Sequence, residues 1–570
     1  MKNKLWFLIA ILLMLTFAGI IYSQQEKDKK MPDFKTEWQQ VEEFDRKGLP
    51  KSALEVVNQI YEKAKKGNNS GQMVKALLER LRFKSSYEED AVINAIQEME
   101  NELAESSFPV KPVLASALAE MYWTFYQRNR YKILSRTAIS GETPEDIRVW
   151  DAEKFVEKSI KLYRASLAEA NELKDVSPDV FDPILLKAPG SREFRPTLYD
   201  LLAHRAADFF MNDETYLTKP AYQFHIRGDA PFLPVAQFAK TTFETADSLS
   251  FKYYALLILQ ELATFHLDDD APDALVDVDL KRLQFVHQHA INERKDSLYV
   301  DALEELEKQY IDFPVSAQAA YQRAQFHLQQ SNQYVPGQKD SPVSEKHKWD
   351  RKTAYEICEA AIKRHPNSSG AANCRALQNQ IEAKRLLIHI EKINLPNAPF
   401  RALVQYQNVP KIYLRAIKVT PEEIKEVKES QRYNTDQWID YYRGRPAVAE
   451  WNVVLPDDGD YHQHGVEIKM PELDFGKYII LAGTNADFSR NRQAATIANT
   501  WISNLSFAQK TTASGKIGIY VFDREAGNPL PGVSGQIWSH QYNQTKRLNE
   551  SVKGDLYTTD EHGLSLIHIS

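Results

Sequence analysis

Residues 302–324, ALEELEKQYIDFPVSAQAAYQRA, and residues 354–376, AYEICEAAIKRHPNSSGAANCRA, follow one pattern. In both copies a proline ends a run of apolar and small residues, and a serine, paired alanines and an Arg-Ala pair follow at the same spacing. The matched positions are Ala302, Leu306, Pro314, Ser316, Ala319, Ala320, Arg323 and Ala324 in the first copy, and Ala354, Cys358, Pro366, Ser368, Ala371, Ala372, Arg375 and Ala376 in the second. Such self-similarity is the sequence signature of stacked helical repeats.

The second copy also indicates the kind of repeat. The spacing of Ala354, Cys358, Ala361 and Pro366 is that of the second helix of a tetratricopeptide repeat (TPR). Outward from it, apolar residues recur with a helical period from residue 34 to residue 385, and prolines fall between the helical runs. The sequence therefore predicts a TPR-like α-solenoid over residues 24–385. Helices are expected over 53–61, 73–83, 91–103, 113–134 and 152–173, and irregular stretches over 212–246 and 331–346.

The hydrophobic period changes from helical to alternating around Leu386. This change predicts an antiparallel, immunoglobulin-like β-sandwich over residues 386–512, with a helical insertion over 421–442. A second β unit is expected over 513–570, so the fold class is multidomain, helical first and β second. The expected strands cover 401–406, 411–417, 447–455, 466–468, 477–482, 500–507 and 517–522, with turn residues such as those of 456–460 between them.

The N-terminus reads as a targeting segment. A positively charged start precedes an uncharged apolar stretch over 5–22, and Ser23 leads into a charged segment, which is typical of a secretory signal peptide over residues 1–23. An uncleaved anchor is the alternative, because this stretch is nearly long enough to span a bilayer. The protein is expected to be exported to the periplasm or the cell envelope or surface, with no membrane span after the signal segment.

The C-terminal part carries two turns with recognisable residues. The strand IYVFDR, residues 519–524, runs into GNPLPGV, residues 527–533, and TTDEHG follows at 558–563. The last residues, 564–570, look like the first half of a strand with nothing to pair with, so the second β unit is expected to be truncated. Glycine permits tight turns, proline fixes φ, and aspartate caps turns through its side chain. The residues singled out in these two turns are Gly527, Pro529, Gly532, Asp560 and Gly563.

These turns resemble the second macroglobulin domain (MG2) of bacterial alpha-2-macroglobulins. In that family a strand ends in a Gly-x-Pro turn, and a Thr-Asp-x-x-Gly turn precedes a later strand. The preceding unit, with LDFGKY at 473–478 feeding a strand, is similar to the first macroglobulin domain. The helical region is similar to the leader of large exported members of the family.

The resemblance implies an endopeptidase inhibitor that traps attacking proteases, its partners, after they cut an exposed bait segment. Many members also carry a Cys-x-Glu-Gln thioester, but neither Cys358 nor Cys374 begins such a motif. This chain would then supply scaffold and a docking surface as the N-terminal part of the inhibitor. The alternative is an envelope or cell-surface binding or assembly scaffold, whose solenoid recruits envelope proteins through its concave face.

No catalytic, cofactor-binding or metal site is expected. Gly-x-Ser-x-Gly, His-Glu-x-x-His and phosphate-binding loops do not occur, so we expect neither an enzyme nor a cofactor. The net charge is 71 − 78 = −7 without a basic stripe, which argues against nucleic acid as a partner. Five residues could form a metal site on a hairpin: Asp457, Asp458, Asp460, His462 and His464. A solvated turn is the expectation for this segment, and the metal site is the alternative.

Three further features have a structural and a functional interpretation. Cys358 and Cys374 lie on successive predicted helices, so they could form a disulfide after export or remain buried and reduced. The tripeptide at 227–229, Arg-Gly-Asp, resembles an integrin-binding sequence but is common by chance. The acidic residues between 268 and 279 lack the glycine and the terminal glutamate of a calcium loop, so helix capping is the expectation.

Overall fold

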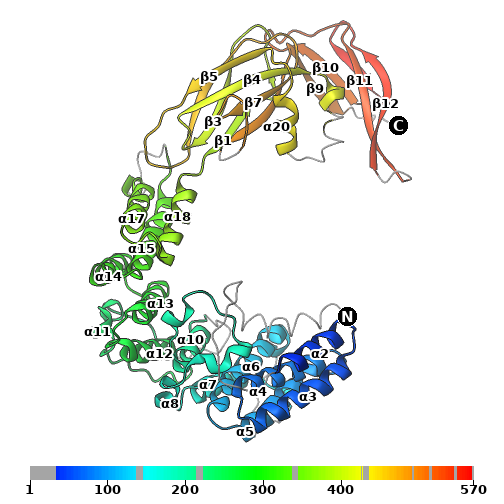
Figure 1. The fold of residues 1–570 in the computed structure, drawn as a ribbon. Coiled ribbons are helices and arrows are strands. Elements are labelled where there is room, and N and C mark those ends of the chain that lie inside the picture. The colour runs from blue at the N-terminus through cyan, green and yellow to red at the C-terminus, as the bar shows by residue number, and fades with distance from the viewer. Residues whose placement is uncertain are drawn as a thin grey trace. The chain divides into compact units, whose positions relative to one another are not determined.

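The chain begins with helices and continues with β-sheets, as Figure 1 shows for the computed structural model. The structure describes residues 34–135, 146–212, 222–336, 345–424, 427, 435–490, 493–511, 517–544 and 548–567. The predicted signal peptide, residues 1–23, lies outside them. Two compact units divide the chain: unit 1 comprises Met1–Arg323 with His365–Ala371, and unit 2 comprises Ala324–Arg364 with Ala372–Ser570.

Unit 1 is built from helices that pack on their neighbours in sequence, for example α2 on α3, α3 on α4 and α6 on α7. Its main helices are α2 (Lys35–Arg46), α3 (Pro50–Lys66), α4 (Ser70–Lys84), α5 (Ala91–Glu105), α6 (Val110–Leu134), α7 (Ala152–Ala165), α10 (Leu198–Phe210), α12 (Phe251–His266), α13 (Asp273–His289) and α14 (Lys295–Gln309). Shorter helices are η1 (Ile147–Val149), α8 (Ala170–Lys174), η2 (Pro178–Ile184), α9 (Ser191–Phe194), η3 (Ala230–Phe232) and α11 (Val235–Phe238). The helical interpretation of this region is confirmed.

Local sequence signals set several helix ends. Pro50 occupies the first turn of α3, where its missing N–H costs nothing. The Asn69 side chain accepts from the backbone N–H of Gln72 and so caps α4. A single helix was expected over 152–173, but α7 ends at Ala165 and α8 follows after a turn. In that turn the Ser166 hydroxyl donates to the carbonyl of Tyr163, which satisfies a group that a continued helix would have used.

The irregular segment before α12 is tied to the helices by one buried arginine. Arg282 on α13 is 1% exposed and pairs with Asp279 one turn earlier. It also donates to the carbonyls of Pro231 and Leu233, at 2.7 and 2.9 Å. A guanidinium with several donors can satisfy loop carbonyls that no secondary structure pairs. This contact gives the described part of the expected irregular stretch 212–246 a fixed path.

The repeat quoted first forms helices α14, α15 (Ser316–Gln330), α17 (Asp350–Arg364) and α18 (Ser369–Ile381), with η4 (Ser331–Gln333) between α15 and α17. At the start of α18 the backbone approaches α15 closely. A Cβ at Gly370 would lie 2.4 Å from the carbonyl carbon of Ala317. The close approach depends on Gly370, whose counterpart in the first copy of the repeat is Gln318.

Two sheets form the first sandwich of unit 2. One has the order β1-β3-β6, and the other has the order β2-β8-β7-β4-β5. All their pairings are antiparallel except β2 with β8. The strands are β1 (Arg385–Ile390), β2 (Ile393–Asn394), β3 (Phe400–Gln407), β4 (Lys411–Val419), β5 (Ala449–Val454), β6 (His464–Met470), β7 (Gly476–Gly483) and β8 (Ala495–Ile502).

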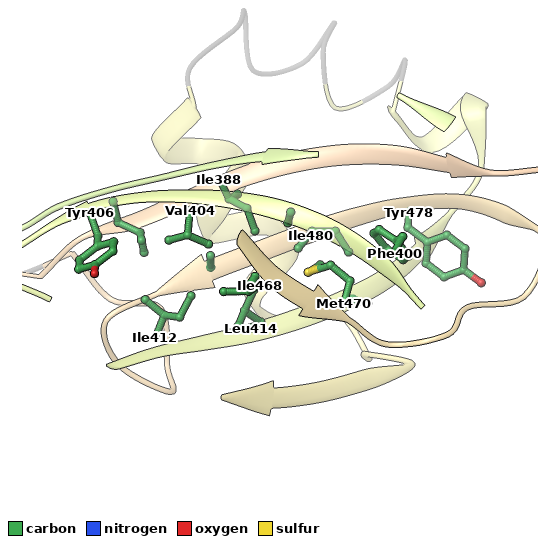
Figure 2. Packing of buried hydrophobic residues seen from close by; sticks show 14 of the residues in the cluster. Ile388, Phe400, Val404, Tyr406, Ile412, Leu414, Ile468, Met470, Tyr478 and Ile480 are labelled. Carbon is green, nitrogen blue, oxygen red and sulfur yellow. The ribbon is translucent and has the colours of Figure 1, made fainter. Parts of the chain in front are cut away.

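The core of this sandwich lies between the two sheets, as Figure 2 shows. Ile388, Val404 and Ile468 come from the three-stranded sheet, and Leu414 and Ile480 face them from the other. Along β3 buried and exposed residues alternate, so the period-two pattern decides which face is inside. The helix α20 (Thr435–Arg443) covers the opposite face of the five-stranded sheet. Together with a helical turn at 421–424, α20 lies in the helical insertion expected over 421–442.

The second β unit begins earlier than expected. The run 500–507 is not one strand, because β8 ends at Ile502 and β9 (Leu505–Thr511) pairs antiparallel with β10 (Ile517–Asp523). The strand β9, which precedes the predicted boundary at 512/513, therefore lies in one sheet with β10 and β13. Asn504 lies at the change of sheet, where its side chain donates to Asp523 and its carbonyl accepts from Arg524.

The C-terminal strand also has a partner, which corrects the expectation for 564–570. The strand β13 (Leu564–Ile567) pairs with β10 in the sheet β13-β10-β9. The preceding turn reverses the chain, and the backbone N–H of Val521 donates to the carbonyl of Gly563 at 2.8 Å. A separate two-stranded sheet consists of β11 (Ser534–Asn543) and β12 (Leu548–Thr558).

Candidate functional site

The two turns that carry the family resemblance lie against each other in the second β unit. Pro529 forms an isolated bridge with Phe522, and the N–H of Leu530 donates to the carbonyl of Val521 at 2.9 Å. From the other turn, Thr559 exchanges backbone hydrogen bonds with the first: its carbonyl accepts from Gly532 and its N–H donates to Val533. The sequence separates these turns by about thirty residues, and the fold joins them.

Gly563 has the tightest surroundings of the motif residues. Its φ is +69°, and a Cβ there would lie 2.6 Å from the carbonyl oxygen of Val521. By contrast, Gly527 and Gly532 have positive φ but open space where a Cβ would stand. The Asp560 carboxylate accepts from the N–H groups of His562 and Leu564, each at 2.9 Å, and these bonds lower its pKa. The turn needs glycine for both conformation and space.

Cys358 on α17 and Cys374 on α18 lie side by side and fully buried. Both thiols are free in the described structure, and a hydrogen bond between them, with burial, raises the pKa of Cys358. A buried thiol with a raised pKa is a poor nucleophile, so these residues have no reactive character as they stand. The predicted disulfide remains a prediction, with its two partners placed together.

The turn between β5 and β6 is only partly solvated, which corrects the expectation for Asp460 and His462. Asp460 is 1% exposed and His462 is 5% exposed. The Asp460 Oδ1 accepts from the backbone N–H of His462 at 2.9 Å and lies 2.8 Å from His464 Nε2. Asp457 stays at the surface, where it accepts from the N–H of Gly459. Gly459 and Tyr461 both adopt positive φ in this segment.

Burial of this turn comes from the helical part of unit 2. Arg351 on α17 donates to the carbonyl of Tyr461 at 3.3 Å, and Tyr355 stacks on the Tyr461 ring. Tyr334 packs edge-on against His462 with ring centroids 4.7 Å apart. Burial, and then the charge of Arg351, lowers the pKa of His462 to about 4, so its imidazole is neutral at neutral pH. Sequence patterns gave no sign of this contact, because it joins residues about a hundred positions apart.

A second buried polar cluster lies in unit 1. His266 is 1% exposed, and its two ring nitrogens lie 2.7 Å from Asp200 Oδ1 and 2.7 Å from Asp269 Oδ2. Asp200 also closes a capping box with Thr197 at the start of α10. A nucleophile does not accompany this histidine in the contacts of the described residues. The contacts of His266 tie the end of α12 to the start of α10 and to Asp269.

The same unit contains a groove of about 1030 Å³. It is lined by residues of α6, η2 and α10, among them Trp123, Phe181, Leu202, His204 and Arg205. His204 is buried and its Nδ1 lies 3.3 Å from Lys281 Nζ. No motif marks these residues in the sequence, because the groove forms only when the helices pack.

The remaining sequence features have structural partners. In the Arg-Gly-Asp tripeptide, Arg227 bridges to Ile291, and Asp229 pairs with Arg294. Among the acidic residues, Asp273 stands in the first turn of α13, while Asp277 pairs with Arg195. Asp269 and Asp279 pair with His266 and Arg282 as described above. Ion pairing accounts for Asp269, Asp277 and Asp279, whereas the expected capping is not seen at Asp273, because the start of α13 has no side-chain cap.

Comparisons with known proteins add little. No protein-family model and no curated protein matches this chain. Among solved structures it is similar to native alpha-2-macroglobulin from Escherichia coli, in a crystal structure spanning domains MG0-NIE-MG1, with 12% sequence identity and a TM-score of 0.22. The match covers 33% of this chain and 64% of that chain. We rest no argument on a likeness this weak.

Among the residues that the structure describes, no helix is both long and apolar enough to cross a membrane.

Proposed function

We propose that this chain is the N-terminal part of an exported alpha-2-macroglobulin-like endopeptidase inhibitor that traps attacking proteases. The observation that carries the proposal is the pair of interlocked turns in the second β unit. The residues that resemble the family pattern, Gly527, Pro529, Gly532, Asp560 and Gly563, form one packed assembly. Their spacing in the sequence and their contact in the fold therefore agree.

The order of domains also supports this proposal. A helical leader precedes an antiparallel sandwich, and the second β unit follows it through Asn504. In this function the chain is not an enzyme; it supplies scaffold and a docking surface. Export to the periplasm or cell envelope belongs to the same proposal, because an inhibitor of foreign proteases acts outside the cytoplasm.

A trapping assay on the full-length native protein tests the proposal. The protein is purified from the envelope fraction and mixed with a panel of proteases. Activity is then measured on a large protein substrate and on a small peptide substrate. Trapping predicts loss of activity on the large substrate alone, because a caged protease still admits small molecules. A protease with a blocked active site serves as control, since it cannot cut a bait segment and should not be trapped.

Unchanged activity on both substrates, with progressive degradation of the protein, would contradict the inhibitor proposal. That outcome would favour the second candidate, an envelope binding or assembly scaffold. The groove of unit 1 favours this alternative, because its lining includes the half-buried Ile184 and Leu185 and the exposed Leu186, which suit an apolar segment of a partner. Cross-linking in intact cells would then identify envelope proteins next to unit 1.

A further inference from the structure

The partly buried turn between β5 and β6 gathers three groups of the kind that bind metal ions. One ligand atom each from Asp458, Asp460 and His464 lies within 4.8 Å of the others. Asp458 is exposed, Asp460 is buried, and His464 is half-buried at the start of β6. The cluster therefore opens to solvent on one side and is anchored in the fold on the other.

Asp460 is the second observation that points to a ligand. Its Oδ1 is occupied by the His462 N–H and by His464 Nε2, but its Oδ2 is buried without a hydrogen-bond partner among the described residues. A buried carboxylate oxygen in that state is costly unless a cation or a donor reaches it. The carboxylate as a whole is 1% exposed, so bulk water does not compensate for the missing partner.

Neighbouring cations do not fill this position. Lys348 Nζ lies 3.7 Å from Asp458 Oδ2, at the exposed end of the cluster. Arg351 donates to the backbone carbonyl of Tyr461. The charge of Asp460 acts on the Arg351 guanidinium, but the two side chains form no ion pair among the described residues. The free oxygen of Asp460 thus stays available to an ion that enters from the side of Asp458.

We propose that Asp458, Asp460 and His464 bind a divalent transition-metal ion of the zinc type. An imidazole nitrogen with two carboxylates suits Zn²⁺, whereas Ca²⁺ and Mg²⁺ prefer oxygen ligands throughout. Tetrahedral zinc with bonds of about 2.0 to 2.1 Å holds its ligand atoms about 3.3 Å apart. The exposed Asp458 supplies most of the movement needed to reach that spacing, and water takes the fourth position.

Binding exchanges one interaction for another at His464. The proton shared between His464 Nε2 and Asp460 Oδ1 leaves to solvent or moves to Nδ1, and the Nε2 lone pair then binds the metal. Lys348 separates from Asp458 and returns to solvent. The ion would brace the turn whose Tyr461 contacts α17, so it would stiffen the contact between the helical and sandwich parts of unit 2. This role is independent of protease trapping.

Zinc binding to the full chain tests the proposal. Metal is removed with a chelator, and zinc chloride is titrated by calorimetry. We expect about one ion per chain with a dissociation constant of about 1 µM or tighter. Asp458→Asn should weaken binding about 10-fold, and His464→Gln about 100-fold or more. The matched control is His389→Gln, since His389 is exposed on β1 of the same sandwich and its Nε2 lies 3.1 Å from Gln405 Oε1.

Hydrogen exchange gives a second measurement that does not depend on calorimetry. At a free zinc concentration of about 1 µM, exchange of the peptide 456–464 should slow in the unmodified chain and in His389→Gln, and much less in Asp458→Asn. Asp458 is exposed, so its replacement leaves folding intact and keeps the test decisive. Binding weaker than about 100 µM, equal binding by His464→Gln, or tighter binding of calcium than of zinc would each overturn the proposal.

Discussion

The ring of Tyr461 stacks on the ring of Tyr355, with centroids 5.4 Å apart and an angle of 17° between the planes. Tyr461 adopts φ of +61°, a conformation that a bulky residue rarely takes. The stack and the hydrogen bond from Arg351 hold this backbone in place. A turn of the first sandwich is therefore fixed by a helix of the repeat region within unit 2.

Loss of the stack should loosen this turn. We expect Tyr355→Ala to destabilise it by about 1 to 2 kcal/mol, because an aromatic pair contributes beyond the area it buries. Hydrogen exchange in the peptide 456–464 should then become about 5 to 30 times faster. Tyr355→Phe is the matched control. It keeps the ring and removes only the hydroxyl, whose hydrogen bond with Glu382 raises the pKa of Tyr355 to about 12.

A phenylalanine variant that exchanges as fast as the alanine variant would show that the hydroxyl, and not the stack, holds the turn. Unchanged exchange in both variants would show that Arg351 and Tyr334 suffice.

The family-like turns give a prediction about glycine. Gly563→Ala should destabilise the second β unit by about 2 to 5 kcal/mol, because left-handed strain adds to a clash with the carbonyl of Val521. Gly527→Ala introduces the same kind of strain without a neighbour, so it should cost about 1 kcal/mol. Limited proteolysis followed by mass spectrometry measures cleavage within 505–567. Equal protection of the two variants would contradict the packing described here.

Local and long-range signals differ in what they reveal. The repeat around Pro314 and Pro366 and the alternation along β3 could be predicted, because neighbouring residues alone decide helix period and strand face. The partner of β9 could not, since pairing depends on a strand that follows it in the chain. Burial of Asp460 was missed for the same reason: its turn has a polar sequence, and distant residues such as Tyr334 and Arg351 cover it.

Two buried histidines of unit 1 should give opposite dependences of stability on pH. Burial disfavours the charged form of His266, but hydrogen bonds to Asp200 and Asp269 outweigh it and raise its pKa. It therefore adds stability below the unfolded pKa of about 6.5, and this is lost as pH rises through the folded pKa. Burial, and then the charges of Arg195 and Lys281, lowers the pKa of His204 well below its usual value. It stays neutral when folded, so acid removes stability below about pH 6.5.

Urea unfolding from pH 5 to pH 8 separates these effects. The unmodified protein should lose stability above about pH 6.5 because of His266, and this loss should be absent in His266→Gln. It should also lose stability below about pH 6.5 because of His204, and this loss should be absent in His204→Gln. Each slope is at most about 1.4 kcal/mol per pH unit for one proton. His225→Gln, at a half-buried position of the same unit, is the control. Slopes of the same sign for both histidines would contradict the contacts described for one of them.

The cysteine pair predicts a redox-dependent stability. Cys358 and Cys374 lie together in the core of the last helical pair, and export would place them in an oxidising compartment. A disulfide there closes a short loop between α17 and α18, which should add about 3 kcal/mol by restricting the unfolded chain. Urea unfolding with and without a reductant measures this difference. Cys374→Ala should unfold identically under both conditions, because no bond can form. As a further test, protein is taken directly from the envelope fraction, denatured and treated with a thiol reagent. Reaction of both thiols would contradict the disulfide. The two cysteines would then be reduced and would only pack against each other.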